Sequence, residues 1–295
     1  MTVQFLANGL CSAAVNSLIA LGFGLIYFAC RIFHIANGAV YTLAGYVAWA
    51  AFVVLGWPLV LAFCAGMGAG VALGIIIELS VYYPLINPRR SRTASPAVAM
   101  MSSLGVYIVG VNLVAMIAGN DTNVLRPGVE KTVYLSGAIL THIQVVQLIT
   151  AAVVLILFGV VLWRTQIGRT IRALADDPEL VSIMGYNVRL LRLGVMAIGS
   201  ALAGAGSILV AFSVGIDPHV GFPAVLIAAV ATIVGGFGCL LAPALGALIL
   251  GILQSIVIWQ TSQKWAPAVA FGVLIVMLIL RPRGILATVK RLEEQ

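Results

Sequence analysis

The sequence predicts an all-α membrane protein, a polytopic bundle of about eight to ten transmembrane helices. Of its 295 residues, 62% are hydrophobic and only 8% are charged. A soluble domain has about 25% charged residues, so the chain lies far outside that class. Several apolar runs also exceed the ~18 residues needed to cross the hydrocarbon core of a bilayer. We therefore expect one transmembrane domain over residues 1–295.

Nine apolar runs, each bounded by Gly, Pro or a charged residue, are expected to span the membrane. In hydrocarbon only helices and closed barrels satisfy the backbone, and continuous apolar runs favour helices over the alternating pattern of a barrel strand. The region 214–245 is rich in Gly and Pro, which makes it a candidate for a broken or re-entrant span. The expected spans cover residues 10–30, 38–56, 59–83, 97–118, 146–163, 191–213, 222–238, 243–261 and 265–281.

Small residues at helical spacing predict where these spans pack closely. Gly66, Gly70 and Gly74 form two overlapping G-x-x-x-G steps. Such steps let helix backbones approach each other in lipid. Glu78 is the one acidic residue inside an expected span, near its cytoplasmic end, and we expect a salt bridge or hydrogen bond there rather than a proton carrier.

The orientation follows from Lys and Arg in short loops, which mark the cytoplasmic side. With nine spans, thirteen of the sixteen basic residues can face the cytoplasm, and Arg126, Lys131 and Lys264 would face outward. This arrangement places the C-terminus in the cytoplasm, whereas the side of the N-terminus depends on the number of spans. It also explains the net charge of +7 better than nucleic-acid binding does.

A polar loop over residues 164–190 interrupts the apolar chain and predicts a short helix. Asp177 can cap the helix, Pro178 suits its first position and Glu179 favours its first turn. Gly185 then supplies the left-handed residue that commonly ends a helix, which gives an expected element over Pro178–Met184. Two interpretations are open for this loop: an amphipathic linker lying on anionic lipid head groups, or a helix that fits a groove in a cytosolic protein.

The run G-R-T-I-R-A-L-A-D-D-P-E-L-V-S-I-M-G-Y-N, residues 168–187, resembles the cytoplasmic coupling loop of branched-chain amino acid ABC importer permeases. Five further motifs resemble that family in order and spacing, over about residues 8 to 286. The resemblance implies that this loop docks on an ATPase subunit. The residues it assigns to coupling are Gly168, Arg169, Arg172, Asp177, Pro178, Glu179, Ile183 and Gly185.

Two of the further motifs contain candidate residues for a substrate pathway. The first is H-I-A-N-G-A-V-Y-T-L-A-G-Y, which includes Asn37, Gly38 and Tyr41; here His34 and Asn37 stand where the family has Asn and His. A helix that begins at Asn37 could offer backbone N–H groups to an amino acid carboxylate, although interhelical hydrogen bonding is an equal alternative. The second is G-I-D-P-H-V-G, which contains Gly215, Pro218 and Gly221 and suits a broken helix lining a cavity.

The resemblance implies a permease subunit of a binding-protein-dependent ABC importer for branched-chain or other hydrophobic amino acids. Its implied partners are two cytosolic ATPases, a second permease that we expect to be non-identical, and a periplasmic or surface-tethered binding protein. The implied location of the chain is a bacterial inner membrane. The chain carries no Walker A motif and no catalytic set of residues, so we expect no cofactor in this chain and no enzymatic activity of its own. The alternatives are a urea or short-amide importer, an ion-coupled secondary carrier and a membrane-embedded enzyme.

Overall fold

The computed structural model describes residues 2–86, 96–125, 132–135, 138–236, 239–260, 262, 265–281 and 284–286. In this part of the chain, six helices are long and apolar enough to cross a membrane, and three shorter apolar helices accompany them. The long spans are α1 (Thr2–Cys30), α2 (Asn37–Trp49) with the π-helix η1 (Ala50–Val54), α3 (Leu59–Ile77) with the π-helix η2 (Glu78–Tyr82) and α4 (Tyr83–Ile86), α5 (Pro96–Ala118), α6 (His142–Arg164) and α9 (Val188–Ser213). The shorter ones are α10 (Gly221–Gly235), α11 (Ala242–Gln260) and α12 (Ala266–Leu280).

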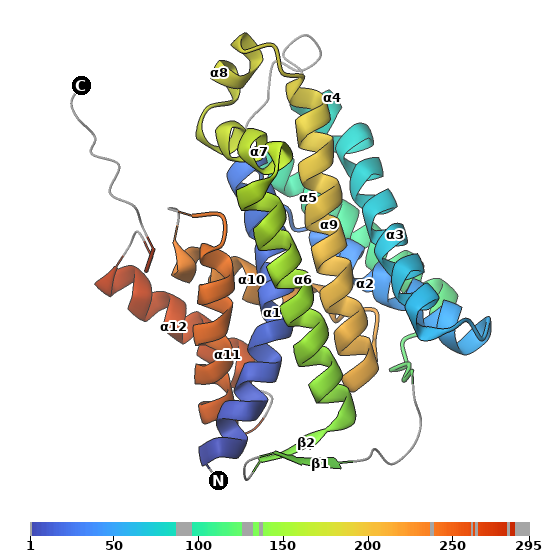
Figure 1. The fold of residues 1–295 in the computed structure, drawn as a ribbon. Helices are drawn as coiled ribbons and strands as arrows, with labels where there is room; N and C mark the ends of the chain where they lie inside the picture. Colours follow the sequence, from blue (N-terminus) through green and yellow to red (C-terminus); the bar gives the residue numbers. More distant parts are fainter. Residues whose placement is uncertain are drawn as a thin grey trace.

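These nine helices coincide with the nine expected spans, so the predicted helical membrane bundle is confirmed. The largest difference is at α1, which begins at Thr2 rather than near residue 10. In Figure 1, α1, α6 and α9 lie at the centre, α2, α3 and α5 on one side, and α10, α11 and α12 on the other. Helix α1 packs against α6, α9, α10 and α11 and therefore forms the core of the bundle.

A short hairpin was not expected from the sequence. Strands β1 (Thr132–Leu135) and β2 (Ala138–Thr141) pair antiparallel, with Thr132 opposite Thr141. Helix α6 begins directly after β2, where Thr141 and Gln144 form a reciprocal capping box. The hairpin thus sets the start of α6 at one end of the bundle, opposite α8 (Pro178–Ile183) (Figure 1).

The glycines of α3 pack as predicted. Gly66, Gly70 and Gly74 are all buried. A Cβ atom on Gly66 would meet the Ala44 carbonyl oxygen of α2, and one on Gly74 would meet the side chain of Ser200 on α9. The absence of side chains therefore lets α3 lie directly on the backbones of α2 and α9.

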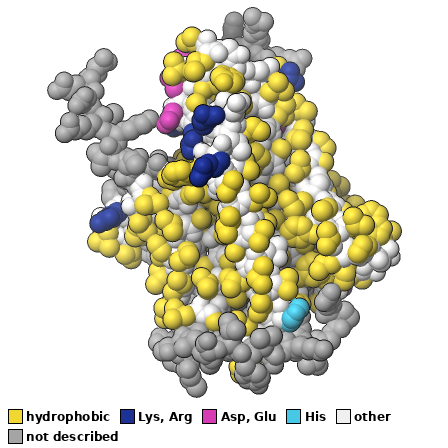
Figure 2. Space-filling view, viewed as in Figure 1, with side chains coloured by type: hydrophobic (Ala, Val, Ile, Leu, Met, Phe, Trp, Pro, Cys, Tyr) yellow, Lys and Arg dark blue, Asp and Glu magenta, His cyan; other side chains and the backbone are white. Residues whose placement is uncertain are grey.

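Basic residues gather at the α8 end of the bundle. Among the described residues these are Arg31, Arg164, Arg169, Arg172, Arg189 and Arg192, which lie at the end of α1, the end of α6, on α7 (Gln166–Asp176) and at the start of α9. Figure 2 shows arginine side chains mainly in the upper part of the visible face and an apolar surface below them. The basic residues expected to face outward, and those at 89, 90 and 92, lie outside the described residues, so the orientation stays a prediction.

Candidate functional site

Helix α8 forms the tip of the molecule, and its two ends are built as the sequence predicts. The Asp177 carboxylate oxygen Oδ1 accepts hydrogen bonds from the backbone N–H of Glu179 at 2.9 Å and of Leu180 at 3.1 Å. Pro178 occupies the first turn, and Gly185 has a φ of 85°, the left-handed conformation that favours glycine. The expected element over Pro178–Met184 is therefore confirmed, one residue shorter.

Helix α8 presents an apolar surface away from the bundle. Ile183 is 82% exposed, and Leu180, Met184 and Tyr186 are also exposed, whereas Val181 is buried. Adjacent exposed apolar side chains of this kind mark interaction sites. Ile183 is the most exposed member of this apolar tip, which we define as Leu180, Ile183, Met184 and Tyr186.

Helix α7 is fastened to the bundle by its own apolar face. Ile171 and Leu174 are buried in the core cluster that includes Leu25 and Leu162. Gly168 is also buried, and a Cβ atom there would overlap the backbone of Leu162. The apolar side chains of Ile171 and Leu174 are thus covered by protein, whereas a linker adsorbed on lipid would turn them toward the membrane.

Two arginines, Arg172 and Arg31, connect α7 to the neighbouring helices. The Arg172 guanidinium lies 5.9 Å from the centroid of the Trp163 ring, while Arg169 is exposed. Arg31, at the end of α1, donates a hydrogen bond of 2.9 Å to the backbone oxygen of Ala175. Arg31 was missed as a site residue because its partner lies 144 positions away in the sequence.

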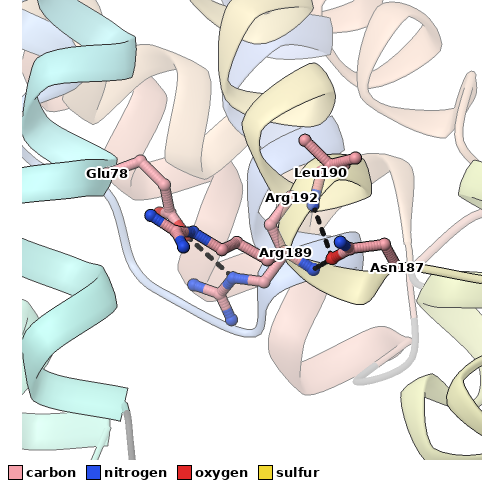
Figure 3. Close-up of polar contacts among 5 residues, drawn as sticks. All are labelled: Glu78, Asn187, Arg189, Leu190 and Arg192. Atoms are coloured by element: carbon pink, nitrogen blue, oxygen red, sulfur yellow. Dashed lines mark hydrogen bonds and ion pairs between the residues drawn. The ribbon is translucent and has the colours of Figure 1, made fainter.

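The first turns of α9 connect this tip to α3. The Asn187 side chain accepts from the backbone N–H of Arg189 and Leu190 and so caps α9 (Figure 3). One turn further on, Arg192 Nε lies 2.9 Å from Glu78 Oε1 in a buried ion pair. The salt bridge expected for Glu78 is therefore confirmed.

Of the six predicted pathway residues, Asn37, Gly38, Pro218 and Gly221 lie where α2 and α10 begin, whereas Gly215 packs against residues 122–124. A Cβ atom on Gly221 would overlap the Gly38 carbonyl oxygen, so the two helix starts touch through their backbones. The segment 214–220 before α10 is not helical, as expected for the Gly/Pro-rich region. The side chains or backbones of Asn37, Gly38, Tyr41, Gly215, Pro218 and Gly221 are all buried within the chain.

Asn37 stands out in this junction. It is fully buried, and neither the nitrogen nor the oxygen of its side-chain amide has a hydrogen-bond partner in the structure. Buried polar groups in native proteins are normally paired, so an unpaired amide at a helix start is a candidate for contact with a ligand or with water. Nearby, Thr42 Oγ1 donates to the Pro218 carbonyl oxygen at 3.4 Å and joins α2 to the segment before α10.

The linker between α1 and α2 holds a small polar network that the sequence did not reveal. His34 Nδ1 lies 2.6 Å from the Tyr82 hydroxyl, and the Ser103 hydroxyl accepts from the backbone N–H of Ala36. Burial lowers the pKa of His34 to about 3, because the charged imidazolium would lose its hydration. Among the described residues, His, Cys, Asp and Glu side chains form no group of three that could hold a metal ion.

Comparison with known proteins decides the class. The family described as branched-chain amino acid transport system / permease component matches residues 5–278 of the chain. The chain belongs to this family. Because that match covers nearly all of the helices described above, the bundle is a membrane-spanning permease.

Individual relatives align over almost the full length of this permease. It is 30% identical to the high-affinity branched-chain amino acid transport system permease protein BraD of Pseudomonas aeruginosa, covering 96% of this chain and 95% of BraD. It is 28% identical to LivH of Escherichia coli K12, a permease protein of the same description, with the same coverage. A probable branched-chain amino acid transport permease of Methanocaldococcus jannaschii is 25% identical over 91% of this chain and 87% of that relative.

Proposed function

We propose that this permease moves branched-chain or other hydrophobic amino acids inward across a bacterial inner membrane, as one membrane subunit of an ABC importer. The observation that carries the proposal is the apolar tip on α8, at the end of the bundle where the arginines gather. Exposure of these apolar side chains to water is unfavourable in free energy, and a groove in a cytosolic partner would bury them. The relatives named above carry branched-chain amino acid transport in their descriptions.

In the proposed mechanism, two cytosolic ATPases clamp on ATP and move α8. The short turn at Gly185, closed by a hydrogen bond from the Tyr186 N–H to the Val181 carbonyl oxygen, joins α8 to the start of α9, and the Arg192–Glu78 pair joins α9 to the end of the α3 span. A movement of α8 would therefore reach both helices as a rigid-body displacement. Alternating access requires such a displacement between an outward-open and an inward-open arrangement.

The remaining parts of the importer follow from the same proposal. A second, non-identical permease completes the conduit, and a periplasmic or surface-tethered binding protein delivers substrate to its outer end. The partner ATPases hydrolyse ATP, so this chain needs no cofactor. The substrate pathway runs along Asn37, Gly38, Tyr41, Gly215, Pro218 and Gly221. The C-terminus faces the cytoplasm.

The other candidate functions have less support. The descriptions of BraD and LivH do not favour a urea or short-amide substrate. An ion-coupled carrier would need an available acid at membrane depth, whereas Glu78 is committed to Arg192.

Reconstitution with all partner subunits tests the proposal. With ATP on the ATPase side and the binding protein on the other, proteoliposomes should take up leucine, and urea should not compete. A Gly185→Val variant should lose most of this uptake, because valine is strained at a φ of 85° and distorts the end of α8. Gly194→Val, on α9 with no atom near the added Cβ, is the matched control. Leucine uptake driven by a proton or sodium gradient without the ATPases would refute the proposal.

A further inference from the structure

Four polar side chains lie on the first half of α1 at intervals of four residues: Gln4, Asn8, Ser12 and Asn16. Residues four apart are neighbours on a helix surface, so these four form one continuous line, the α1 polar stripe. At 1.5 Å per residue the stripe is about 18 Å long. It runs from the end of the molecule that carries β1 and β2 to the middle of the candidate span Gln4–Cys30 (Figure 1).

The inner half of the stripe lies between two packed faces of α1. On one side, Gly9 and Ala13 lie against Gly251 of α11. On the other side, Val15 and Ile19 lie beside Gly206 of α9. At 100° per residue, the two polar positions 12 and 16 fall between these faces. Helices α9 and α11 make little or no contact with each other, and between them Ser12 is exposed and Asn16 is half-buried.

The hydrogen bonds of the stripe are confined to its outer end. The Gln4 side chain accepts from the backbone N–H of Ile139 at 2.7 Å and donates to its carbonyl oxygen at 2.8 Å. It also donates to Asn8 Oδ1 at 3.3 Å. Ser12 is exposed and Asn16 is half-buried, and neither side chain has a hydrogen-bond partner among the described residues. Polar groups at this depth are costly against lipid, so they are expected to face water or protein.

The stripe ends where α10 begins to cover α1. Ile19 and Phe23 lie seven residues after Ser12 and Asn16, and therefore on the same side of α1. Both belong to a core cluster with Val225 and Ala228 of α10. Helix α10 starts at Gly221, which lies against Gly38. The inner end of the stripe therefore leads to a cluster that also contains Tyr41 of α2.

We infer that the α1 polar stripe lines the outer half of the substrate pathway, as a hydrated wall along which a zwitterionic amino acid reaches the junction of α2 and α10. This inference rests on the proposed function. Hydroxyl and amide groups donate and accept hydrogen bonds, so they suit both the ammonium and the carboxylate group of the substrate. None of the four side chains is charged, which allows the substrate to move from one contact to the next without being trapped.

Cysteine labelling of the assembled importer tests the inference. Ser12→Cys and Asn16→Cys would be exposed to a charged, membrane-impermeant thiol reagent added on the outer side, with labelling assigned to individual cysteines, apart from the natural Cys11 and Cys30, by fragmentation in a mass spectrometer. Thiols react as thiolates, which require water, so a hydrated wall predicts labelling at least about tenfold faster than at a lipid-facing cysteine. Leu10→Cys is the matched control, because Leu10 is 42% exposed on another face of the same helix.

Each result has one meaning. Fast labelling at both positions, slowed by docking of the substrate-loaded binding protein, supports the inference. Labelling no faster than at Leu10→Cys overturns it, as does protection of both positions by the second permease in every nucleotide state, which would make the stripe a subunit interface. If the importer takes up leucine and the stripe stays unlabelled, the inference fails while the proposed function stands; if the stripe labels and leucine is not taken up, the proposed substrate fails.

Discussion

The buried pair between Glu78 and Arg192 offers the sharpest test of how α9 is held to α3. Their side chains are 4% and 15% exposed, and Glu78 Oε2 and Arg192 Nη2 already lack partners. At the observed 2.9 Å, two unit charges attract by about 6 kcal/mol with an effective dielectric constant of about 20. Burial of both ions costs a similar amount, so the pair contributes little compared with two neutral residues.

Removal of one partner is different, because it leaves the other charge buried and unpaired. We expect Glu78→Gln and Arg192→Met each to lower the free energy of unfolding by about 3–5 kcal/mol. The double variant should lose less than either single variant. Arg189→Met is the matched control, since Arg189 (Figure 3) is exposed on the same helix, and its guanidinium lies 4.0 Å from the centroid of the Tyr83 ring without an ion-pair partner among the described residues. It should lose about 0.5–1 kcal/mol.

Reversible unfolding by sodium dodecyl sulfate in mixed micelles measures these differences for all four variants. A double-mutant cycle then gives the coupling between the two positions. Losses that simply add, with a coupling below about 0.5 kcal/mol, would refute the assignment of this pair as a structural link.

Two further predictions concern the junction and the linker. Gly221→Ala should lower the free energy of unfolding by about 1–3 kcal/mol and reduce leucine uptake, because the added Cβ overlaps the Gly38 carbonyl oxygen. Gly105→Ala is the control, since no atom lies near its added Cβ, and it should change neither quantity. Equal effects of the two variants on thermal unfolding and on uptake would contradict the close approach of Gly221 to Gly38. Because burial holds the pKa of His34 near 3 rather than 6.5, protonation favours the unfolded state: stability should be full above pH 6.5 and fall by up to about 1.4 kcal/mol per pH unit below it. The fall should disappear in His34→Gln, and an identical pH profile in both proteins would exclude this cause.

The sequence predicted the nine helices because hydropathy and helix breakers are local signals. It placed the start of α1 too late, since Gln4 and Asn8 dilute the apolar pattern, although the structure pairs Gln4 with Ile139 on β2. The hairpin itself went unpredicted, because its strands are four residues each and do not stand out from the apolar chain.

Contacts between distant residues could not be predicted in the same way. The sequence indicated that Glu78 needs a partner, but Arg192 is 114 positions away and only the packing of α3 on α9 selects it. Likewise the two pathway motifs, at Asn37 and at Gly215, were predicted separately, and only the fold joins them at the start of α2 and α10. Their role in transport stays a prediction, as does the role of the α8 residues in coupling.

The most direct test of the proposed drive is the contact made by Ile183. A photo-crosslinking residue at this position, the most exposed of the apolar tip, should form an adduct with an ATPase subunit in the assembled importer, and the yield should change when ATP is added. The same residue at Ile156, 66% exposed in the middle of α6, should crosslink to lipid and serve as the control. Adducts of Ile183 with lipid alone, in an importer that still takes up leucine, would contradict the claim that force enters this permease through α8.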